Sequence, residues 1–244
     1  MTRWSRVSVF GVRLIAVLCL PAAASAQPRP AIADQIAKAY GFDAFGQVEA
    51  IRYTFDLDGG PKFKFHRSWV WEPKLDQITY EGPDKAGKPV KVTYKRSQLA
   101  TQDAFVKEVV DPNFFNDQYW LVFPFHIIWD TGATVEDAGM HKLPLGKGKA
   151  RKVVVKYPST GGYLPGDTWA LFVGHDMRIR ELEFHHGGNA KPSVVIANWT
   201  GYKKGGPLLF SLDHHGKADG KPFRLWYTKV AVRLTGSDAW VEAK

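Results

Sequence analysis

The sequence predicts a mainly β fold with α insertions, organised as a strongly curved antiparallel sheet (an unclosed β-barrel) of about 10–11 strands. Short runs alternate apolar and polar residues with a period of two, as half-buried strands do. Turns rich in Gly, Asp, Asn and Pro separate these runs at a spacing of roughly 10–12 residues. One aromatic segment with few charges interrupts the alternation, and it predicts a helical lid or plug inside the concavity.

Residues 1–26 have the pattern of a secretory signal peptide. Three arginines precede a short apolar run, Leu14–Leu20, and the small residues Ala24, Ser25 and Ala26 follow it. The run is too short to span a membrane. We therefore expect cleavage after Ala26 and a bacterial, periplasmic protein with a single domain over residues 27–244.

Cysteine and charge exclude several classes of function. The only cysteine, Cys19, lies inside the apolar run, so disulfides and thiolate chemistry are not expected in residues 27–244. The bulky Leu18 before it argues against lipid attachment at this cysteine. The net charge of +9 is spread over many loops, which is typical of a solvated surface or of weak attraction to anionic lipid headgroups. No nucleic-acid partner is expected.

The first elements are predicted from the spacing of apolar residues, which changes from helical intervals to strict alternation. Residues 32–39 carry apolar side chains at helical intervals and predict a helix. The alternating runs Ile51–Leu57 and Phe63–Trp71 are joined by a Gly-Gly-Pro turn, which predicts a β-hairpin. Two further strands are expected at residues 77–81 and 90–94.

The aromatic segment follows these strands. Asp111 and Pro112 are typical of a helix start, with Pro at the first helical position. The segment up to Asp130 is crowded with aromatic side chains, so it must cover an apolar surface or be covered by one. After it, we expect strands at residues 150–157, 168–173, 179–185, 193–200, 208–212 and 223–234.

Motifs for catalysis or metal binding are weak. The pair His185-His186 and the pair His214-His215 cannot each chelate one ion within a strand, because adjacent side chains point to opposite faces. There is no GxSxG motif and no Gly-rich phosphate loop. His126 and Asp130, spaced i and i+4, are either a buried hydrogen-bonded pair or the acid–base pair of a hydrolase or isomerase. We assign no catalytic residue, no metal site and no cofactor.

Aromatic residues are the most distinctive feature of the composition. The chain has 9 Trp, 9 Tyr and 15 Phe, and many fall at inward-facing positions of predicted strands. This abundance favours a cavity or binding surface, with an aromatic core as the alternative. Arg67 is in phase with these inward rings, so it requires a carboxylate on the lid, an aromatic face or the polar head of a ligand as its partner.

These features together resemble the LolA/LolB-like fold of periplasmic lipoprotein carriers and related lipid-binding proteins. The resemblance rests on the signal peptide, the leading helix, the first hairpin, the helical insertion and the pattern over Gly166–Val173 and Ile179–Phe184. It implies an unclosed barrel, closed over by helices, that holds acyl chains or another apolar ligand. The chain departs from the carriers in its bulkier aromatic insertion and in having no identifiable acceptor loop and no lipid anchor.

The resemblance implies a carrier for a lipid or another acylated or hydrophobic ligand, monomeric, with transient contact to a membrane or a membrane protein. The alternatives are an enzyme that uses His126 and Asp130 in the same cavity, or a protein-binding module with a filled core and an exposed sheet edge. The residues that we expect to line the cavity are Phe63, Phe65, Arg67, Trp69, Trp71, Trp120, Phe123, Phe125, Trp129, Trp169, Leu171, Leu182 and Phe184.

Overall fold

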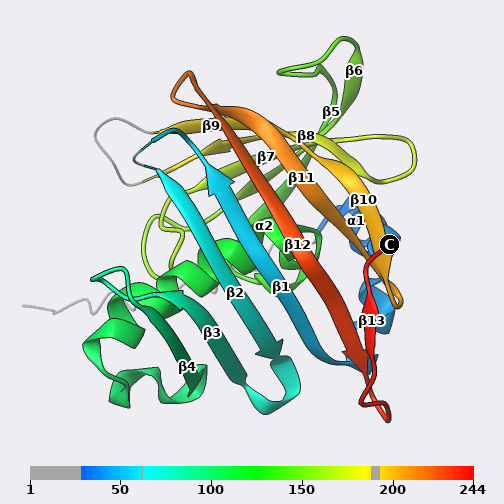
Figure 1. Ribbon diagram of the computed structural model, residues 1–244. Coiled ribbons are helices and arrows are strands. Elements are labelled where there is room, and N and C mark those ends of the chain that lie inside the picture. The colour runs from blue at the N-terminus through cyan, green and yellow to red at the C-terminus, as the bar shows by residue number, and fades with distance from the viewer. Residues whose placement is uncertain (1–28, 62, 188–192) are drawn as a thin grey trace, which may run out of the picture.

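The computed structural model describes residues 29–61, 63–187 and 193–244. The predicted signal peptide, residues 1–26, lies outside the described residues. In the described part, thirteen strands form one antiparallel sheet that curves strongly and does not close (Figure 1). The predicted fold class is therefore confirmed.

The sheet runs in the order β4-β3-β2-β1-β12-β11-β9-β8-β7-β6-β5, while β10 pairs with β11 and β13 with β12. The strands are β1 (Val48–Asp58), β2 (Lys64–Glu72), β3 (Gln77–Pro83), β4 (Pro89–Lys95), β5 (Thr134–Lys142), β6 (Lys149–Lys156), β7 (Thr168–Val173), β8 (Ile179–His185), β9 (Val194–Asn198), β10 (Thr200–Gly205), β11 (Leu208–Ala218), β12 (Lys221–Leu234) and β13 (Trp240–Glu242). Because β4 and β5 stand at opposite ends of this order, the sheet is a half-barrel with two free edges.

The first hairpin sets the phase of the concave face. Strands β1 and β2 pair Phe55 with Arg67 and Tyr53 with Trp69, as their alternation predicts. Tyr53, Phe55 and Trp69 are buried in the main core. Arg67 therefore shares the inner face with buried aromatic rings, which confirms the predicted phase of this strand.

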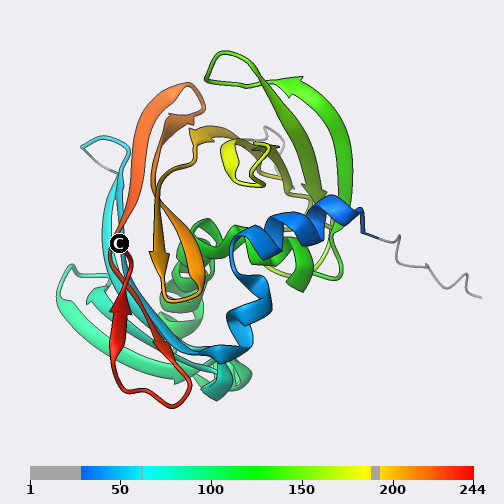
Figure 2. The same cartoon turned by 90° about the vertical axis from the view of Figure 1, so that its right-hand side faces the viewer.

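Helix α2 (Asp111–Trp129) fills the concavity, and the sheet curves around it (Figures 1 and 2). Pro112 occupies the first turn, where its missing N–H costs nothing. Pro124 lies inside the helix and cannot donate to the preceding turn, and Val122 departs from helical geometry with φ −121° and ψ 22°. Nearly every face of α2 is buried, because it packs against the sheet and against α1 (Ala31–Ala39).

Shorter helical turns complete the cover of the concave side. Among the described residues these are η1 (Phe42–Gln47), η2 (Pro73–Leu75), η3 (Arg96–Thr101) and the π-helical η4 (Val106–Val110). Helix α1 buries Ile32 and Ile36, the spacing that predicted it. No described helix has the length and apolar character that crossing a bilayer requires.

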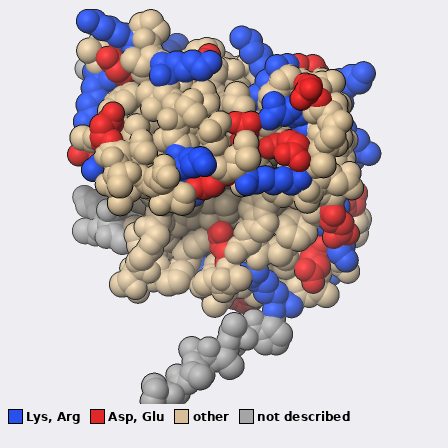
Figure 3. All heavy atoms as spheres, turned by 90° about the horizontal axis from the view of Figure 1, so that it is seen from below, with Lys and Arg blue, Asp and Glu red and all other residues tan. Residues whose placement is uncertain are grey.

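Strands β5, β10 and β13 were not predicted from the sequence, because their sequences are mixed and largely polar. Strand β5 is an edge of the sheet, and β10 and β13 pair only with β11 and β12. On the face in Figure 3, basic and acidic side chains are interspersed, without a large area of one sign. This face has the character of a solvated surface.

Candidate functional site

An open cavity of about 720 Å³ lies at one end of the half-barrel, where the ends of β1, β2, β8, β9, β11 and β12 come together beside α2. In Figure 1 the β1–β2 and β11–β12 turns lie at the upper left. The lining residues are Leu57, Gly59, Phe63, Phe65, Arg67, Asn113, Asn116, Trp120, Phe184, Ser193, Val195, Ala218, Lys221, Pro222, Phe223 and Leu225. Most of them are apolar, and the volume lies in the range of small-molecule sites.

Two phenylalanines of the first hairpin stand at the mouth with their rings in water. Phe63 is 52% exposed and Phe65 38% exposed. Their ring centroids are 4.9 Å apart in an edge-to-face arrangement. Large aromatic side chains are rarely left exposed in pairs beside a cavity unless something covers them. An apolar guest in the cavity would remove both rings from water.

Arg67 lies at the inner edge of the cavity and links the sheet to α2 through an ion pair. Its guanidinium, only 6% exposed, donates to both carboxylate oxygens of Asp117 at 2.6 and 2.7 Å. It also lies over the rings of Phe55 and Phe65, at 4.9 and 4.7 Å from their centroids. The partner of this inward arginine is therefore a carboxylate on the helix, together with aromatic faces.

Asp117 is fully buried and receives further donors. Trp69 Nε1 donates to its carboxylate at 2.9 Å, and Tyr227 donates from its hydroxyl to the Asp117 carbonyl oxygen at 2.6 Å. Burial raises the pKa of Asp117, and the Arg67 guanidinium acts in the opposite direction. Removing one partner of such a bidentate ion pair lowers the stability of the fold strongly, because the charge of the other partner stays buried without compensation.

The structure divides the predicted lining residues into three groups. Phe63, Phe65, Arg67, Trp120 and Phe184 meet at the 720 Å³ cavity. Trp71 and Trp129 border a different cavity, described below. The remaining six are buried in the core between α2 and the sheet and do not line the 720 Å³ cavity: Trp69, Phe123, Phe125, Trp169, Leu171 and Leu182.

Helix α2 explains this division. It lies deep in the concavity, so its rings and those of the sheet pack against each other; the rings of Phe123 and Trp169 stack at 4.3 Å. The 720 Å³ cavity remains between Asn113, Asn116 and Trp120 of α2 and the strand ends near the hairpin tips. Residues of those tips, such as Val195, Ala218 and Phe223, line the cavity although they were not singled out from the sequence. The alternation in β12 was a signal that could have found Phe223 and Leu225.

A second cavity of about 400 Å³ contains the His126–Asp130 pair, so the pair does not border the 720 Å³ cavity. His126 Nδ1 donates to the Asp130 carboxylate at 3.1 Å, and Nε2 contacts the side-chain amide of Gln118 at 3.1 Å. Burial lowers the pKa of His126, against the effect of Asp130. Burial opposes ionisation of Asp130, but hydrogen bonds from His126 and two tyrosines lower its pKa below the ordinary value.

Internal hydrogen bonds engage the His126–Asp130 pair. Both ring nitrogens of His126 are occupied by protein groups, so neither is available as a base to a guest molecule. The described lining of the 400 Å³ cavity includes no serine, threonine, cysteine or lysine that could serve as a nucleophile. The geometry is that of a buried hydrogen-bonded histidine.

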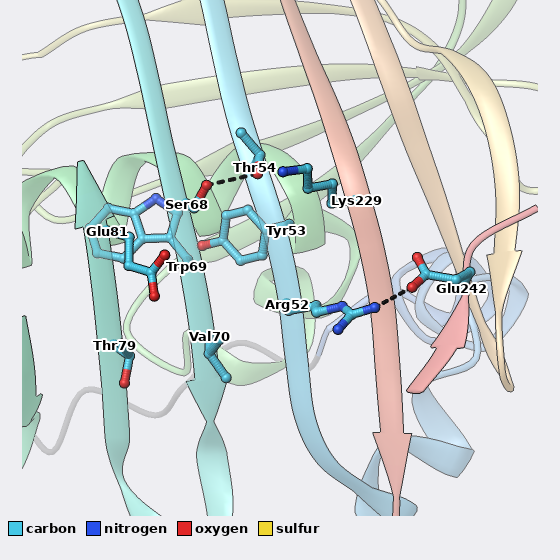
Figure 4. Close-up of a pocket in the computed structure, with 10 residues that line it drawn as sticks. All are labelled: Arg52, Tyr53, Thr54, Ser68, Trp69, Val70, Thr79, Glu81, Lys229 and Glu242. Atoms are coloured by element: carbon cyan, nitrogen blue, oxygen red, sulfur yellow. Dashed lines mark hydrogen bonds and ion pairs between the residues drawn. The ribbon is translucent and has the colours of Figure 1, made fainter. Parts of the chain in front are cut away.

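A third recess, of about 440 Å³, lies on the convex face (Figure 4). Lys229 stands beside it with φ 53°, at the bulge where the register between β1 and β12 shifts. Arg52 pairs with Glu242, and the hydroxyls of Thr54 and Ser68 are 2.8 Å apart. The lining is polar and its charges are balanced, unlike that of the apolar cavity.

The paired histidines do not form a metal centre. His185 contacts Glu183 at 2.5 Å, His186 contacts Asp167 at 3.0 Å, and His215 contacts Asp213 at 3.3 Å. Over residues 29–61, 63–187 and 193–244, no three side chains of His, Cys, Asp or Glu are grouped closely enough to hold an ion.

No family model matches the chain, and no curated protein matches it. The solved structures that are similar to this chain include the following three. A DUF1329 family protein from Desulfovibrio piger has a TM-score of 0.46 and 8% identity, over 87% of this chain and 97% of that one. The LolA superfamily protein NE2245 from Nitrosomonas europaea has a TM-score of 0.45 and 8% identity, over 83% and 92% of the two chains. The lipoprotein LppX from Mycobacterium tuberculosis has a TM-score of 0.32 and 9% identity, over 83% and 96%.

Proposed function

We propose that this protein binds and carries a hydrophobic ligand, of the lipid or acylated class, in the 720 Å³ cavity at the mouth of the half-barrel. The observation that carries the proposal is the cavity itself, with its apolar lining and the exposed rings of Phe63 and Phe65 at its edge. The binding energy would come from burial: about 0.8 kcal/mol for each CH₂ removed from water, or ~10 kcal/mol for a chain of about twelve carbons before ordering costs.

The open mouth of the cavity also favours a protein that transfers its ligand over one that stores the ligand permanently. It opens at the strand ends that line the cavity, and Arg67 at the inner edge forms a buried ion pair with Asp117. A ligand can therefore enter and leave at the mouth without unfolding of the sheet. The predicted signal peptide supports a periplasmic location, where a monomeric carrier would exchange its ligand in transient contact with a membrane or a membrane protein.

Native mass spectrometry and organic extraction of the purified protein test the proposal. We expect a co-purifying mass that extraction identifies as a lipid, or uptake of the apolar fluorescent probe N-phenyl-1-naphthylamine. The variant Phe65→Glu should weaken probe binding at least about tenfold, because it places a charge against the apolar lining. Met140→Glu is the matched control, since Met140 is an exposed apolar residue on β5 outside the cavity lining.

Three outcomes would overturn the proposal. The first is the absence of both a bound lipid and probe uptake in the wild type. The second is equal loss of probe binding in Phe65→Glu and Met140→Glu. The third is probe binding that neither variant changes, because the probe would then occupy another surface.

A further inference from the structure

Small residues of β9 and β11 continue the floor of the 720 Å³ cavity inward, beyond the residues that line it. Strands β9 and β11 pair Val195 with Ala218 at the mouth and Ala197 with Gly216 one step deeper. Gly216 has no room for a side chain, because a Cβ there would lie 2.0 Å from the Ile196 carbonyl oxygen. The two strands therefore pack closely here, and from Val195 to Trp199 four residues of strand cover about 13 Å.

Trp199 and His214 stand at the inner end of this floor, one further step along the same face of the two strands. Their ring centroids are 4.3 Å apart, and both residues are completely buried. Trp120, which lines the cavity, covers them: its ring lies 5.9 Å from Trp199 and 5.8 Å from His214. Rotation of the Trp120 side chain would join the cavity to this pair.

The pair presents one donor and one acceptor without partners. Within the described residues, Trp199 Nε1 and His214 Nε2 make no hydrogen bond, which is costly for buried polar atoms. His214 Nδ1 faces the Asn198 carbonyl oxygen at 3.2 Å; since a carbonyl only accepts, Nδ1 carries the proton. Burial lowers the pKa of His214 to about 4, so the ring is neutral at pH 7 and Nε2 is an acceptor.

We propose that the cavity extends past Trp120 to a polar subsite, where the inner end of the ligand carries a hydroxyl group that donates to His214 Nε2 and accepts from Trp199 Nε1. This inference rests on the proposed function and specifies its ligand class: a long-chain alcohol or another amphiphile with a terminal hydroxyl. A carbonyl group could only accept, and an ammonium group could only donate. A site built around a hydroxyl rejects an analogue that lacks it, because its own polar atoms stay unpaired.

Displacement of N-phenyl-1-naphthylamine from the full protein tests the inference with two matched competitors, 1-dodecanol and its methyl ether. The ether keeps the acceptor but has no O–H donor. We expect the alcohol to displace the probe at about tenfold lower concentration than the ether from the wild type. In His214→Phe, which keeps an aromatic ring but removes the acceptor, the ratio should fall to about one, and probe affinity should be retained. Trp199→Phe, which removes the donor, is the second variant.

The outcomes separate the two proposals. If the wild type neither holds a co-purifying lipid nor binds the probe after organic extraction, the proposed function fails. If the probe binds but the wild type does not prefer the alcohol, only the hydroxyl subsite is refuted, and the two polar atoms serve an internal water molecule. If the preference survives in folded His214→Phe and in folded Trp199→Phe, as judged by near-ultraviolet circular dichroism, the subsite is also refuted, because the selectivity then arises elsewhere.

Discussion

Replacing Arg67 with leucine would leave the Asp117 carboxyl buried without its cation. The guanidinium supplies two hydrogen bonds to that carboxylate, at 2.6 and 2.7 Å, in a site where Asp117 has no exposure to solvent. Breaking one side of such a pair costs about 3–5 kcal/mol of unfolding free energy. Domains have only about 5–15 kcal/mol in total, so Arg67→Leu should be folded but marginal.

Urea denaturation followed by tryptophan fluorescence measures this cost. With a denaturant slope of about 3 kcal/mol per molar, the midpoint should fall by roughly 1–2 M. The double variant Arg67→Leu/Asp117→Leu should recover most of the loss, because it removes the stranded charge as well. Lys91→Ala is the matched control: its exposed ion pair with Glu81 is 2.6 Å long, and its removal should cost less than about 1 kcal/mol.

The variant should also gain a characteristic pH dependence. Burial already raises the pKa of Asp117, and loss of the guanidinium removes the main opposing influence. A carboxyl with a raised pKa in the folded state binds more protons than in the unfolded state, so stability falls as pH rises through that pKa. Arg67→Leu should therefore be less destabilised at pH 5 than at pH 8. A loss no larger than that of Lys91→Ala, or a double variant no more stable than the single one, would refute the reasoning.

Three further predictions concern the core and the sheet. Gly216→Ala should destabilise the fold severely, because the new Cβ would lie 2.0 Å from the Ile196 carbonyl oxygen. The control Gly132→Ala should be tolerated, because its Cβ would lie 3.9 Å from the nearest atom, Pro158 Cγ. Equal thermal midpoints of the two variants would contradict this prediction. His214 should contribute a loss of about 3 kcal/mol in stability between pH 6.5 and about 4, because its lowered pKa means that the unfolded chain takes up the proton first. The difference between the wild type and folded His214→Phe over this range measures that contribution, since the lowered pKa of His126 is common to both. Equal pH profiles of the two proteins would exclude His214 as the cause. Phe123→Ala should cost about 3–5 kcal/mol by urea titration, since its ring is fully buried against Trp169, and a loss below about 1 kcal/mol would mean that α2 is not a packed part of the core.

The alternation in the sequence predicted most of the sheet, because half-buried strands must separate apolar from polar side chains. It predicted the β1–β2 hairpin and the inward phase of Arg67, both of which the register confirms. It did not predict β10, whose sequence from Thr200 to Gly205 is polar and glycine-containing. Such a strand is specified by its pairing with β11 rather than by its own pattern.

The cavity was less predictable than the sheet. Trp69 and Trp120 are the same residue type in similar apolar surroundings, yet one is packed in the core and the other borders the cavity. The difference depends on how deeply α2 lies in the concavity, which no local pattern encodes. The partner of Arg67 was equally inaccessible, because Asp117 lies 50 residues away and only the tertiary fold brings the two together.

The pairing of β1 with β12 has a consequence for how the molecule is made. Val48 is aligned with Leu234, so the centre of the sheet joins the beginning of the described chain to its end. Contacts of such long sequence separation form slowly, and they cannot form before β12 has been synthesised. Until then the sheet that covers the rings of α2 is incomplete, and exposed apolar surface of this kind favours aggregation.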